Sequence, residues 1–283
     1  MQKKIGFIGQ GWIGKHYADD FEKRGFDVTR YALEEPYNGN GHQIKDCDIV
    51  FIAVPTPTTP NGFDGRIVKN VLPMVGEGKI AVIKSSILPG FTEEAQKENP
   101  HIFVFHSPEF LREASAAYDA ANPRRNIIGM PVHSKEYKQK AEEIMAVLPS
   151  APFKLICSSR EAEFIKYAGN CFLYLKVIYA NLLYDLSENL GLDYETVKDA
   201  IAADPRIGAS HLDPIHASGR GAGGHCFIKD FAVFREMYEK TIGDRTGADA
   251  LKAIEKKNIE LLLKSNKDLD LLSGVYGEGV LKS

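Results

Sequence analysis

Apolar runs and amphipathic segments alternate along the first 158 residues of the chain. The apolar runs are short and mostly continuous, which is typical of strands buried on both faces of a parallel sheet. The amphipathic segments predict covering helices, and the first of these, residues 12–25, ends at Gly25. The predicted strands lie at residues 3–9, 26–33, 48–54, 79–86, 101–107, 126–132 and 153–158. Residues 1–158 are therefore expected to form a doubly wound α/β domain.

The pattern changes at Ser158, where a long helical segment begins. Ser158 and Glu161 have the spacing of a capping box, and Gly191 provides a stop about thirty residues later. A helix of that length would span about 45 Å. It is apolar around most of its circumference, which predicts burial between elements or subunits. Asp193 is the expected N-cap of the next helix, which ends at Asp204-Pro205.

Two further helical patterns cover residues 230–240 and 248–264. Residues 159–264 are thus predicted to form an all-α central domain built on the long helix. The tail, residues 265–283, is expected to be ordered only in part.

Composition and charge exclude several functional classes. The chain is 44% hydrophobic with a net charge of −3, so it has neither a basic footprint for nucleic acid nor a polybasic membrane signal. It has no apolar run of about twenty residues and no signal peptide pattern at its start. The four cysteines lack CxxC spacing and the eight histidines lack metal-ligand spacing. We expect a cytoplasmic protein with no metal site.

A glycine-rich turn follows the first predicted strand and opens the first predicted helix. It fits GxGxxG, in which the glycines permit a tight turn, close approach of a pyrophosphate and helix–strand packing. The domain is therefore expected to be Rossmann-like and to bind a dinucleotide. The residues concerned are Gly9, Gly11, Trp12, Ile13 and Gly14.

The end of the second strand bears on the choice between NAD and NADP. Ala32 occupies the position where an acid would bind the ribose hydroxyls, and Glu34 is the nearest alternative. Arg30 could instead bind a 2′-phosphate. NAD is preferred, and NADP stays open.

Three groups of polar residues carry candidate chemistry. Lys166 and Asn170 are four residues apart on the long helix, so their side chains leave the same face. A lysine near apolar surface can polarise an oxygen or relay a proton, although a solvated lysine on a helix flank is the simpler interpretation. Glu109 and Glu113 have the same spacing, for which an exposed face is the simpler interpretation. Ser86 follows a strand at the edge where doubly wound folds bind ligands, and loop hydrogen bonding would also explain it.

Cys226 lies in the segment GAGGHCFIKD, and its neighbours favour reactivity over packing. The glycines let backbone and substrate approach the thiol closely, and a nearby cation such as Lys229 favours thiolate. Asp230 could accept a hydrogen bond or steer a water. The other three cysteines, Cys47, Cys157 and Cys171, lie in apolar contexts and are expected in the core.

Seven stretches follow one another between residues 5 and 230: GFIGQGWIG, AVPTP, KSSILPG, SPEFLREA, EFIKYAGN, DPRIG and GGHCFIKD. Together, in this order, they resemble the UDP-glucose/GDP-mannose dehydrogenase family. The resemblance implies two successive NAD-dependent oxidations that convert the C6 hydroxymethyl group of a nucleotide sugar to a carboxylate. UDP-glucose is the expected sugar. It also implies an NAD-binding domain and a homodimer through the long helix.

The same resemblance assigns roles to individual residues. Cys226 would be the nucleophile that forms a thiohemiacetal and a thioester, and Asp230 would help to activate the hydrolytic water. Lys166 and Asn170 would stabilise the oxyanion. The other assignments are Ser86 for water binding, Glu109 as base in acyl-enzyme hydrolysis, Glu113 and Gly223 at the substrate, Pro55, Thr56 and Lys229 at the cofactor (Lys229 there or at the substrate), and Arg206 reaching the sugar from the partner subunit.

The chain departs from this family at several points. Ala32 replaces the ribose-binding acid, and Ala222 stands where the family has an aromatic residue. Family members continue into a further UDP-binding domain, so the resemblance implies a shortened form. Two alternatives stay open: a single-step dehydrogenase of the 3-hydroxyacid type, and a non-catalytic NAD-binding homologue.

Overall fold

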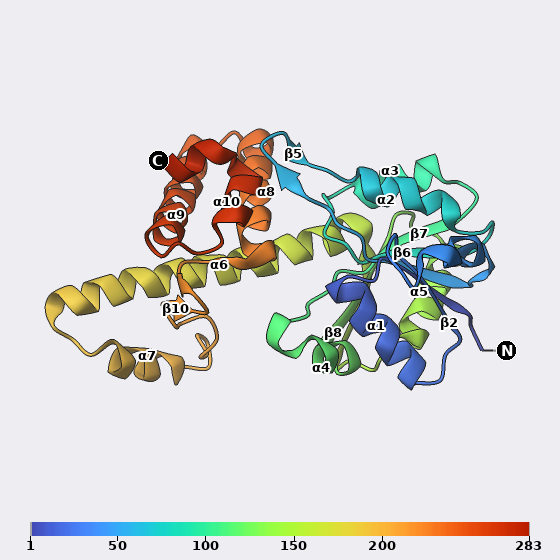
Figure 1. The fold of residues 1–283 in the computed structure, drawn as a ribbon, viewed down its shortest axis with the longest axis horizontal. Coiled ribbons are helices and arrows are strands. Elements are labelled where there is room, and N and C mark those ends of the chain that lie inside the picture. The colour runs from blue at the N-terminus through green and yellow to red at the C-terminus, as the bar shows by residue number, and fades with distance from the viewer. Residues whose placement is uncertain (1, 283) are drawn as a thin grey trace. The chain divides into compact units, whose positions relative to one another are not determined.

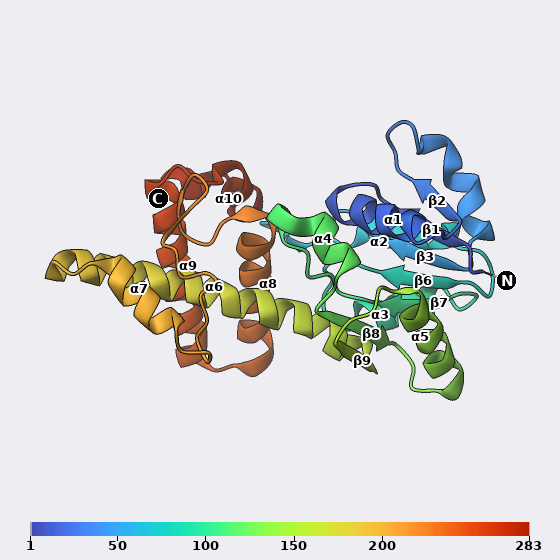
Figure 2. The same cartoon turned by 90° about the horizontal axis from the view of Figure 1, so that it is seen from below.

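The computed structural model describes residues 2–282, which divide into two compact units. The first unit, residues 1–57 and 64–166, contains a seven-stranded sheet of order β2-β1-β3-β6-β7-β8-β9. Figure 2 shows β1, β3, β6 and β7 next to one another. The strands are β1 Ile5–Ile8, β2 Val28–Tyr31, β3 Ile49–Ile52, β6 Ile80–Ile83, β7 Phe103–His106, β8 Arg125–Met130 and β9 Phe153–Ser158.

All seven predicted strands are confirmed, but the sheet is not entirely parallel. β7 and β8 pair antiparallel, with His106 opposite Gly129. β8 and β9 are again parallel to each other, from Arg125 opposite Phe153 to Met130 opposite Ser158. The direction of a strand depends on the path of the chain between strands, which the apolar pattern does not encode.

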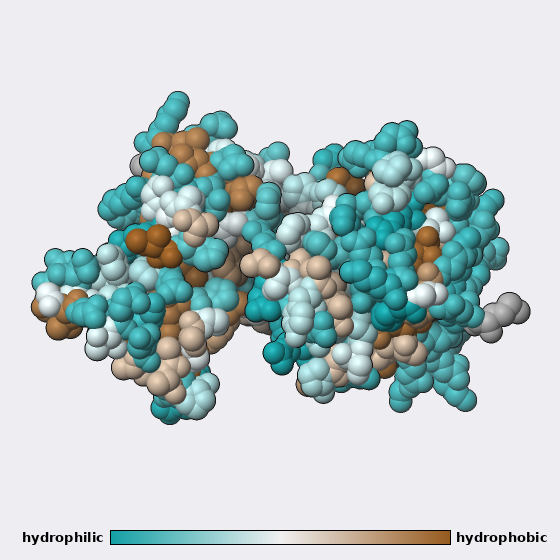
Figure 3. Space-filling model, turned by 60° about the horizontal axis from the view of Figure 1, so that its bottom comes forward, coloured by the Kyte–Doolittle hydropathy of each residue, from teal (hydrophilic) through white to brown (hydrophobic). Residues whose placement is uncertain are grey.

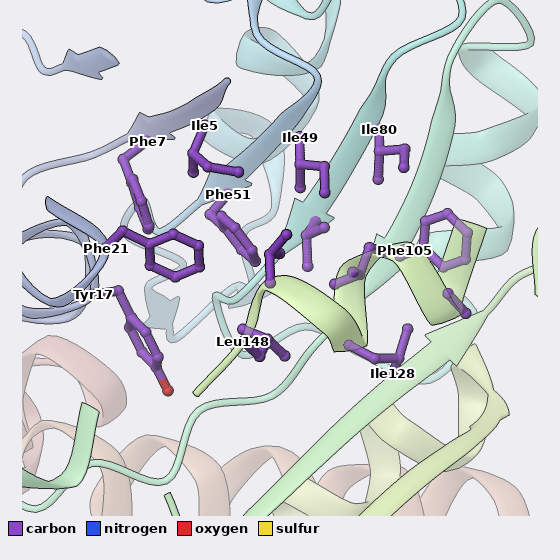
Figure 4. Close-up of a cluster of buried hydrophobic side chains, with 14 of the residues drawn as sticks. Ile5, Phe7, Tyr17, Phe21, Ile49, Phe51, Ile80, Phe105, Ile128 and Leu148 are labelled. Carbon is purple, nitrogen blue, oxygen red and sulfur yellow. The ribbon is translucent and has the colours of Figure 1, made fainter. Parts of the chain in front are cut away.

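Helices and the central strands enclose the apolar core of this unit. Phe7, Phe21 and Phe51 pack with ring centroids 5.1–5.4 Å apart, and all three are buried (Figure 4). Burial of such a side chain contributes roughly 1.5–3 kcal/mol. The helices of the unit are α1 Trp12–Lys23, α2 Arg66–Val71, α3 Phe91–Glu98, α4 Ala116–Ala121 and α5 Lys135–Val147, with 3₁₀ turns η1 Asn38–Asp46, η2 Leu72–Met74 and η3 Glu113–Ser115.

The second unit, residues 58–63 and 167–283, is mostly helical. Figure 1 shows its helices around the later part of α6. Tyr174 of α6 stacks on Phe231 of α8 with ring centroids 3.9 Å apart, which fixes α8 against α6. The elements are α6 Ser159–Leu190, α7 Tyr194–Ala202, α8 Gly224–Ile242, α9 Arg245–Lys264, α10 Leu269–Tyr276 and η4 Glu278–Lys282, with hairpins β4 Thr58–Thr59/β5 Gly62–Phe63 and β10 Ile215–His216/β11 Gly219–Arg220.

The ends of α6 follow the signals in the sequence. The Ser158 N–H donates to the Glu161 carboxylate at 2.8 Å, and the Glu161 N–H donates to the Ser158 hydroxyl at 3.3 Å, so the capping box is formed. Gly191 has a φ of +67° after the last turn, a conformation that favours glycine. Asp193 caps α7 through the N–H groups of Glu195 and Thr196.

The domain limits differ from those expected at residues 158 and 264. The division between the units falls within α6, after Lys166, because the first turns of this helix pack with the sheet domain. The expectation of a partly ordered tail is wrong: α10 and η4 occupy it. Leu272 is buried against Ile228 and Leu262, so the tail is part of a core cluster.

Candidate active site

The glycine-rich turn between β1 and α1 has the geometry that GxGxxG predicts. Gly9 has a φ of +90°, and a Cβ there would lie 2.2 Å from the Ala53 carbonyl oxygen. A Cβ on Gly14 would lie 1.9 Å from the Gly9 carbonyl oxygen, so only glycine lets the helix pack this closely. A Cβ on Gly11 would meet no atom of the described residues within 4 Å.

The start of α1 therefore fits the pyrophosphate of NAD. Within this fully described helix the first turn carries no acidic residue, and the N-cap Gly11 has no side chain to occupy the N–H groups. Those N–H groups and the helix dipole favour an anion. The neighbouring Trp12 is half exposed and contacts His16 edge-on, with ring centroids 4.9 Å apart.

Arg30 is already occupied by carboxylates and does not present a vacant guanidinium to a 2′-phosphate. It donates to both oxygens of Glu22 at 2.7–2.9 Å and to Asp19 at 2.7 Å. Its third neighbour is the side-chain oxygen of Gln10, at 3.4 Å. This carboxylate surround disfavours a phosphate, so the geometry favours NAD. Ala32 is buried at the end of β2 and Glu34 is exposed.

The carboxyl ends of β3 and β6 are tied together by Ser85 rather than by Ser86. The Ser85 hydroxyl accepts from the Val54 N–H at 3.0 Å and donates to the Val54 carbonyl at 2.6 Å. Ser86, the predicted water-binding residue, follows it and is half-buried. Pro55 is exposed and Thr56 is buried just beyond β3, on the same sheet edge.

Lys166 and Glu109 form a buried ion pair. The Lys166 Nζ donates to the Glu109 carboxylate Oε1 and to its backbone carbonyl, each at 2.8 Å. The second carboxylate oxygen accepts from the Leu111 N–H at 2.8 Å. Both side chains are about 5% exposed, so neither is the solvated side chain of the simpler interpretation. Glu113, by contrast, is exposed at the start of η3.

Two buried polar residues that the sequence did not single out lie beside this pair. Burial lowers the pKa of Lys84 to about 8; the Glu109 carboxylate opposes that shift and Lys166 adds to it. The Lys84 Nζ donates to the Ser107 hydroxyl at 3.2 Å and lies 4.4 Å from the centre of the Tyr17 ring. Burial lowers the pKa of His106 to about 3, which keeps its ring neutral. The available signal was a charged residue directly after the apolar run of β6.

Glu163 holds the loop that follows Ser86. Its carboxylate accepts from the Gly90 N–H at 2.6 Å, from the Thr92 N–H at 2.8 Å and from the Thr92 hydroxyl at 2.5 Å. Glu163 lies one turn before Lys166 on α6, so this contact anchors the loop to the helix that carries the lysine. Burial raises the pKa of Glu163 to about 7, against the opposing effect of the three hydrogen bonds.

This raised pKa predicts a stability that falls as pH rises. The folded-state pKa of Glu163 is above its ordinary 4.5, so the contribution is complete below pH 4.5 and lost as pH passes 7. The free energy of unfolding should fall by at most about 3 kcal/mol over that range, and Glu163→Gln should remove the decline. Chemical denaturation at several pH values measures it. Glu142→Gln, at an exposed position of α5, is the control, and a decline that persists in Glu163→Gln contradicts the assignment.

Cys226 is exposed in the first turn of α8. The N-cap Gly223 has no side chain, and the first turn of this fully described helix carries no acidic residue. The N-terminal end of a helix favours a thiolate. The other cysteines sit where expected or nearly so: Cys47 and Cys171 are buried and Cys157 is half-buried. Burial raises the pKa of all three thiols.

Asp230 lies one turn after Cys226, so the two side chains leave the same side of α8. Asp230 is fully buried, and its carboxylate accepts from the Asn170 amide at 2.6 Å and from the Lys229 ammonium at 2.5 Å. Three of the predicted site residues are thus in contact within the second unit. Lys229 therefore forms an ion pair with Asp230.

Two residues predicted to contact the substrate, Arg206 and Gly223, lie against carboxylates of this chain. Arg206 is exposed and pairs with Asp204, with Nε 3.0 Å from Oδ1. The loop that carries it is fixed to α6 because the Lys176 Nζ donates to the Ile207 and Gly208 carbonyls at 2.8 and 2.9 Å. Gly223 faces Asp268, where a Cβ would lie 2.0 Å from the carboxylate oxygen.

Family models match both parts of the chain. The NAD binding domain of the UDP-glucose/GDP-mannose dehydrogenase family matches residues 37–148, and the central domain of the same family matches residues 160–259. The chain belongs to this family. The matched NAD binding domain indicates NAD as the cofactor.

Individual relatives agree with this assignment. A UDP-glucose 6-dehydrogenase from Rickettsia felis is 30% identical over 250 residues, which cover 85% of this chain and 53% of the relative. A UDP-glucose dehydrogenase structure from Pyrobaculum islandicum has a TM-score of 0.78 at 28% identity and covers 93% of this chain and 70% of that one. The chain spans little more than half the length of the curated relatives that are UDP-glucose 6-dehydrogenases.

One solved structure shares the fold over nearly the whole length of both chains. The 3-hydroxyisobutyrate dehydrogenase of Mycobacterium tuberculosis has a TM-score of 0.73 at 16% identity and covers 98% of this chain and 99% of that one. At this identity the likeness concerns the fold alone. Across residues 2–282, no helix combines the length and apolar character needed to cross a membrane.

Proposed function

We propose that the chain acts as a nucleotide-sugar 6-dehydrogenase that oxidises a C6 primary alcohol to a carboxylate through a covalent adduct on Cys226. UDP-glucose is the substrate favoured by the names of its relatives. The observation that carries the proposal is the exposed thiol in the first turn of α8, one turn from an Asp230 carboxylate held by Asn170. A packing cysteine needs neither the exposure nor the carboxylate.

Each step of the reaction has a residue suited to it. When bound at the start of α1, NAD would supply the hydride acceptor for both oxidations, so two NADH would be counted per sugar. The Lys166 ammonium and the Asn170 amide donate hydrogen bonds to the C6 oxygen while the alcohol becomes an aldehyde. The Cys226 thiolate then adds to the aldehyde carbon and makes it tetrahedral, because a bare aldehyde cannot release a second hydride.

Hydrolysis completes the cycle. Loss of the second hydride from the thiohemiacetal leaves a thioester on Cys226. Water held by Ser86, with Asp230 and Glu109 as bases, attacks the thioester carbon and releases the carboxylate and the thiol. The remaining assignments are Gly9, Gly11, Trp12, Ile13, Gly14, Glu34, Pro55, Thr56 and Lys229 toward the cofactor, and Glu113, Arg206 and Gly223 toward the substrate.

A homodimer through α6 is part of the proposal. Five large apolar side chains of α6 in the second unit are 48–67% exposed, and their spacing places them along one stripe of the helix. Figure 3 shows brown apolar patches on a largely teal surface. A stripe of this kind is typical of an interface. Its residues are Phe172, Tyr179, Leu182, Leu186 and Leu190.

Counting NADH per substrate tests the function. Nucleotide sugars are first screened by thermal shift with NAD, since a ligand that binds the native state raises the melting temperature. The sugar that binds is then supplied in limiting amount, and two NADH per molecule are expected. One NADH per molecule of a small hydroxyacid would instead support the single-step dehydrogenase, whose fold this chain shares over its full length. If the chain binds NAD but no nucleotide sugar, the result would support the non-catalytic NAD-binding homologue.

A further inference from the structure

The backbone of the loop before Cys226 is held by residues about forty positions later in the chain. The Arg220 N–H donates to the Ser265 hydroxyl at 2.9 Å. Asn258 makes two bonds with Ala222, accepting from its N–H at 2.7 Å and donating to its carbonyl at 3.0 Å. The Gly224 N–H donates to the Asp268 carboxylate at 2.7 Å. The loop of residues 219–224 is thus bound along its length from α9 and the turn after it.

Lys267 adds a buried cation to this support. Its Nζ donates to the carbonyls of His216, Gly219 and Gly221 at 3.1, 3.2 and 3.0 Å. These three bonds use all three donors of the ammonium group. Lys267 is only 4% exposed, and a buried charge is tolerated when it is hydrogen-bonded in this way.

Two glycines of the loop are explained by α9 and the turn after it. A Cβ on Gly223 would lie 2.0 Å from the Asp268 carboxylate and 2.8 Å from Lys267 Cε. Gly221 has a φ of +93°, and a Cβ there would lie 3.0 Å from the Asn258 side-chain oxygen. Gly221 and Gly223 are therefore required because α9 and the turn after it pack directly on the backbone of the loop.

Asp268 also replaces a missing cap. Gly223 is the N-cap of α8 and cannot accept a hydrogen bond with a side chain, so the first helical N–H bonds the Asp268 carboxylate instead. Cys226 is two residues further along the same turn. Asn266 and Asp268, on either side of Lys267, both have a left-handed backbone with φ of 51–52°, which is uncommon for residues other than glycine.

We propose that Asp268 and Lys267 are positioning residues that hold the first turn of α8 in the conformation in which Cys226 reacts as a thiolate. The proposal rests on the proposed function only in taking Cys226 as the nucleophile. In this proposal neither Asp268 nor Lys267 contacts the substrate or the cofactor. Their effect passes through the loop backbone and the first turn of the helix.

The pH profile of Cys226 alkylation tests the proposal without substrate or cofactor. The rate with iodoacetamide, followed at the Cys226 peptide by mass spectrometry, is measured at pH 7 and at pH 10, and the ratio reports the thiolate fraction. Asp268→Ala should lower this ratio about fivefold, because a frayed first turn no longer favours the thiolate. Asp268→Asn keeps an acceptor and removes a negative charge, so its ratio should be unchanged or higher. Lys267→Met should lower the ratio as Asp268→Ala does.

The control and the contradicting result use the same measurement. Asp270→Ala removes an exposed carboxylate two residues away and should leave the ratio unchanged. Folded Asp268→Ala and Lys267→Met proteins with the ratio of the unsubstituted chain would overturn the proposal. If Asp268→Ala does not fold, Asp268→Ser decides in its place. A chain that makes no sugar acid but shows these shifts would overturn the function and keep the positioning role.

Discussion

Cys226→Ser is expected to abolish formation of the sugar carboxylate, by a factor on the order of 10³ or more. A serine hydroxyl is far less ionised than a thiol at neutral pH, so the aldehyde is not converted into the tetrahedral adduct that releases the second hydride. In the proposed mechanism the first oxidation does not need the thiol. A single turnover should therefore yield at most one NADH per bound sugar, together with an aldehyde that a carbonyl reagent can trap.

The substitution should separate chemistry from folding. Cys226 is exposed, so the serine variant should unfold within about 0.5 kcal/mol of the unsubstituted chain. Cys157→Ser, at a half-buried position of β9, should retain two NADH per sugar and serves as the matched control. Two NADH per sugar at an undiminished rate from Cys226→Ser would remove the covalent adduct from the mechanism.

The sequence predicted those features that depend on local pattern. Every strand of the large sheet follows from a short apolar run, and the ends of α6 follow from Ser158, Glu161 and Gly191. The antiparallel step at β8 could not be predicted in this way. An apolar run is buried equally well in either direction, so only the tertiary path fixes the direction.

The site was predicted as separate residues, and its contacts came from the fold. The family resemblance assigned Lys166 to the oxyanion, but its pairing with Glu109 spans 57 positions of the chain and has no local signature. Glu163 was visible only as an acid on an apolar helix, three residues before Lys166. Its role depends on the loop at Gly90 and Thr92, which no spacing rule connects with it.

The tail shows why weak local patterns mislead. Residues 265–283, which contain several polar residues and glycines, were expected to be ordered only in part. Leu269, Leu271 and Leu272 nevertheless supply apolar side chains to α10, and Leu272 is fully buried. The helix is stable because Ile228 and Leu262 cover it, and such long-range burial is not visible in a short window.

Lys166→Met is expected to lower both stability and activity, because it leaves a buried carboxylate without its cation. Glu109 is about 6% exposed at the side chain, and removing one partner of a buried ion pair typically costs 3–5 kcal/mol. In the proposed mechanism the oxyanion also loses a charged donor, which should reduce the rate of the first hydride transfer by about 10²–10³-fold. Urea denaturation and single-turnover NADH formation measure the two effects. Lys154→Met, at an exposed position of β9, should change neither.

The double variant Lys166→Met/Glu109→Gln distinguishes the structural from the catalytic role of this pair. Neutralising Glu109 removes the uncompensated charge, so most of the lost stability should return, with a coupling free energy of a few kcal/mol between the two sites. Activity should not return, because the neutral pair offers no cation to the developing oxyanion. If activity recovers together with stability, neither the Lys166 cation nor the Glu109 carboxylate is needed for the reaction. If neither recovers, Lys166 supports the fold through contacts other than its ion pair.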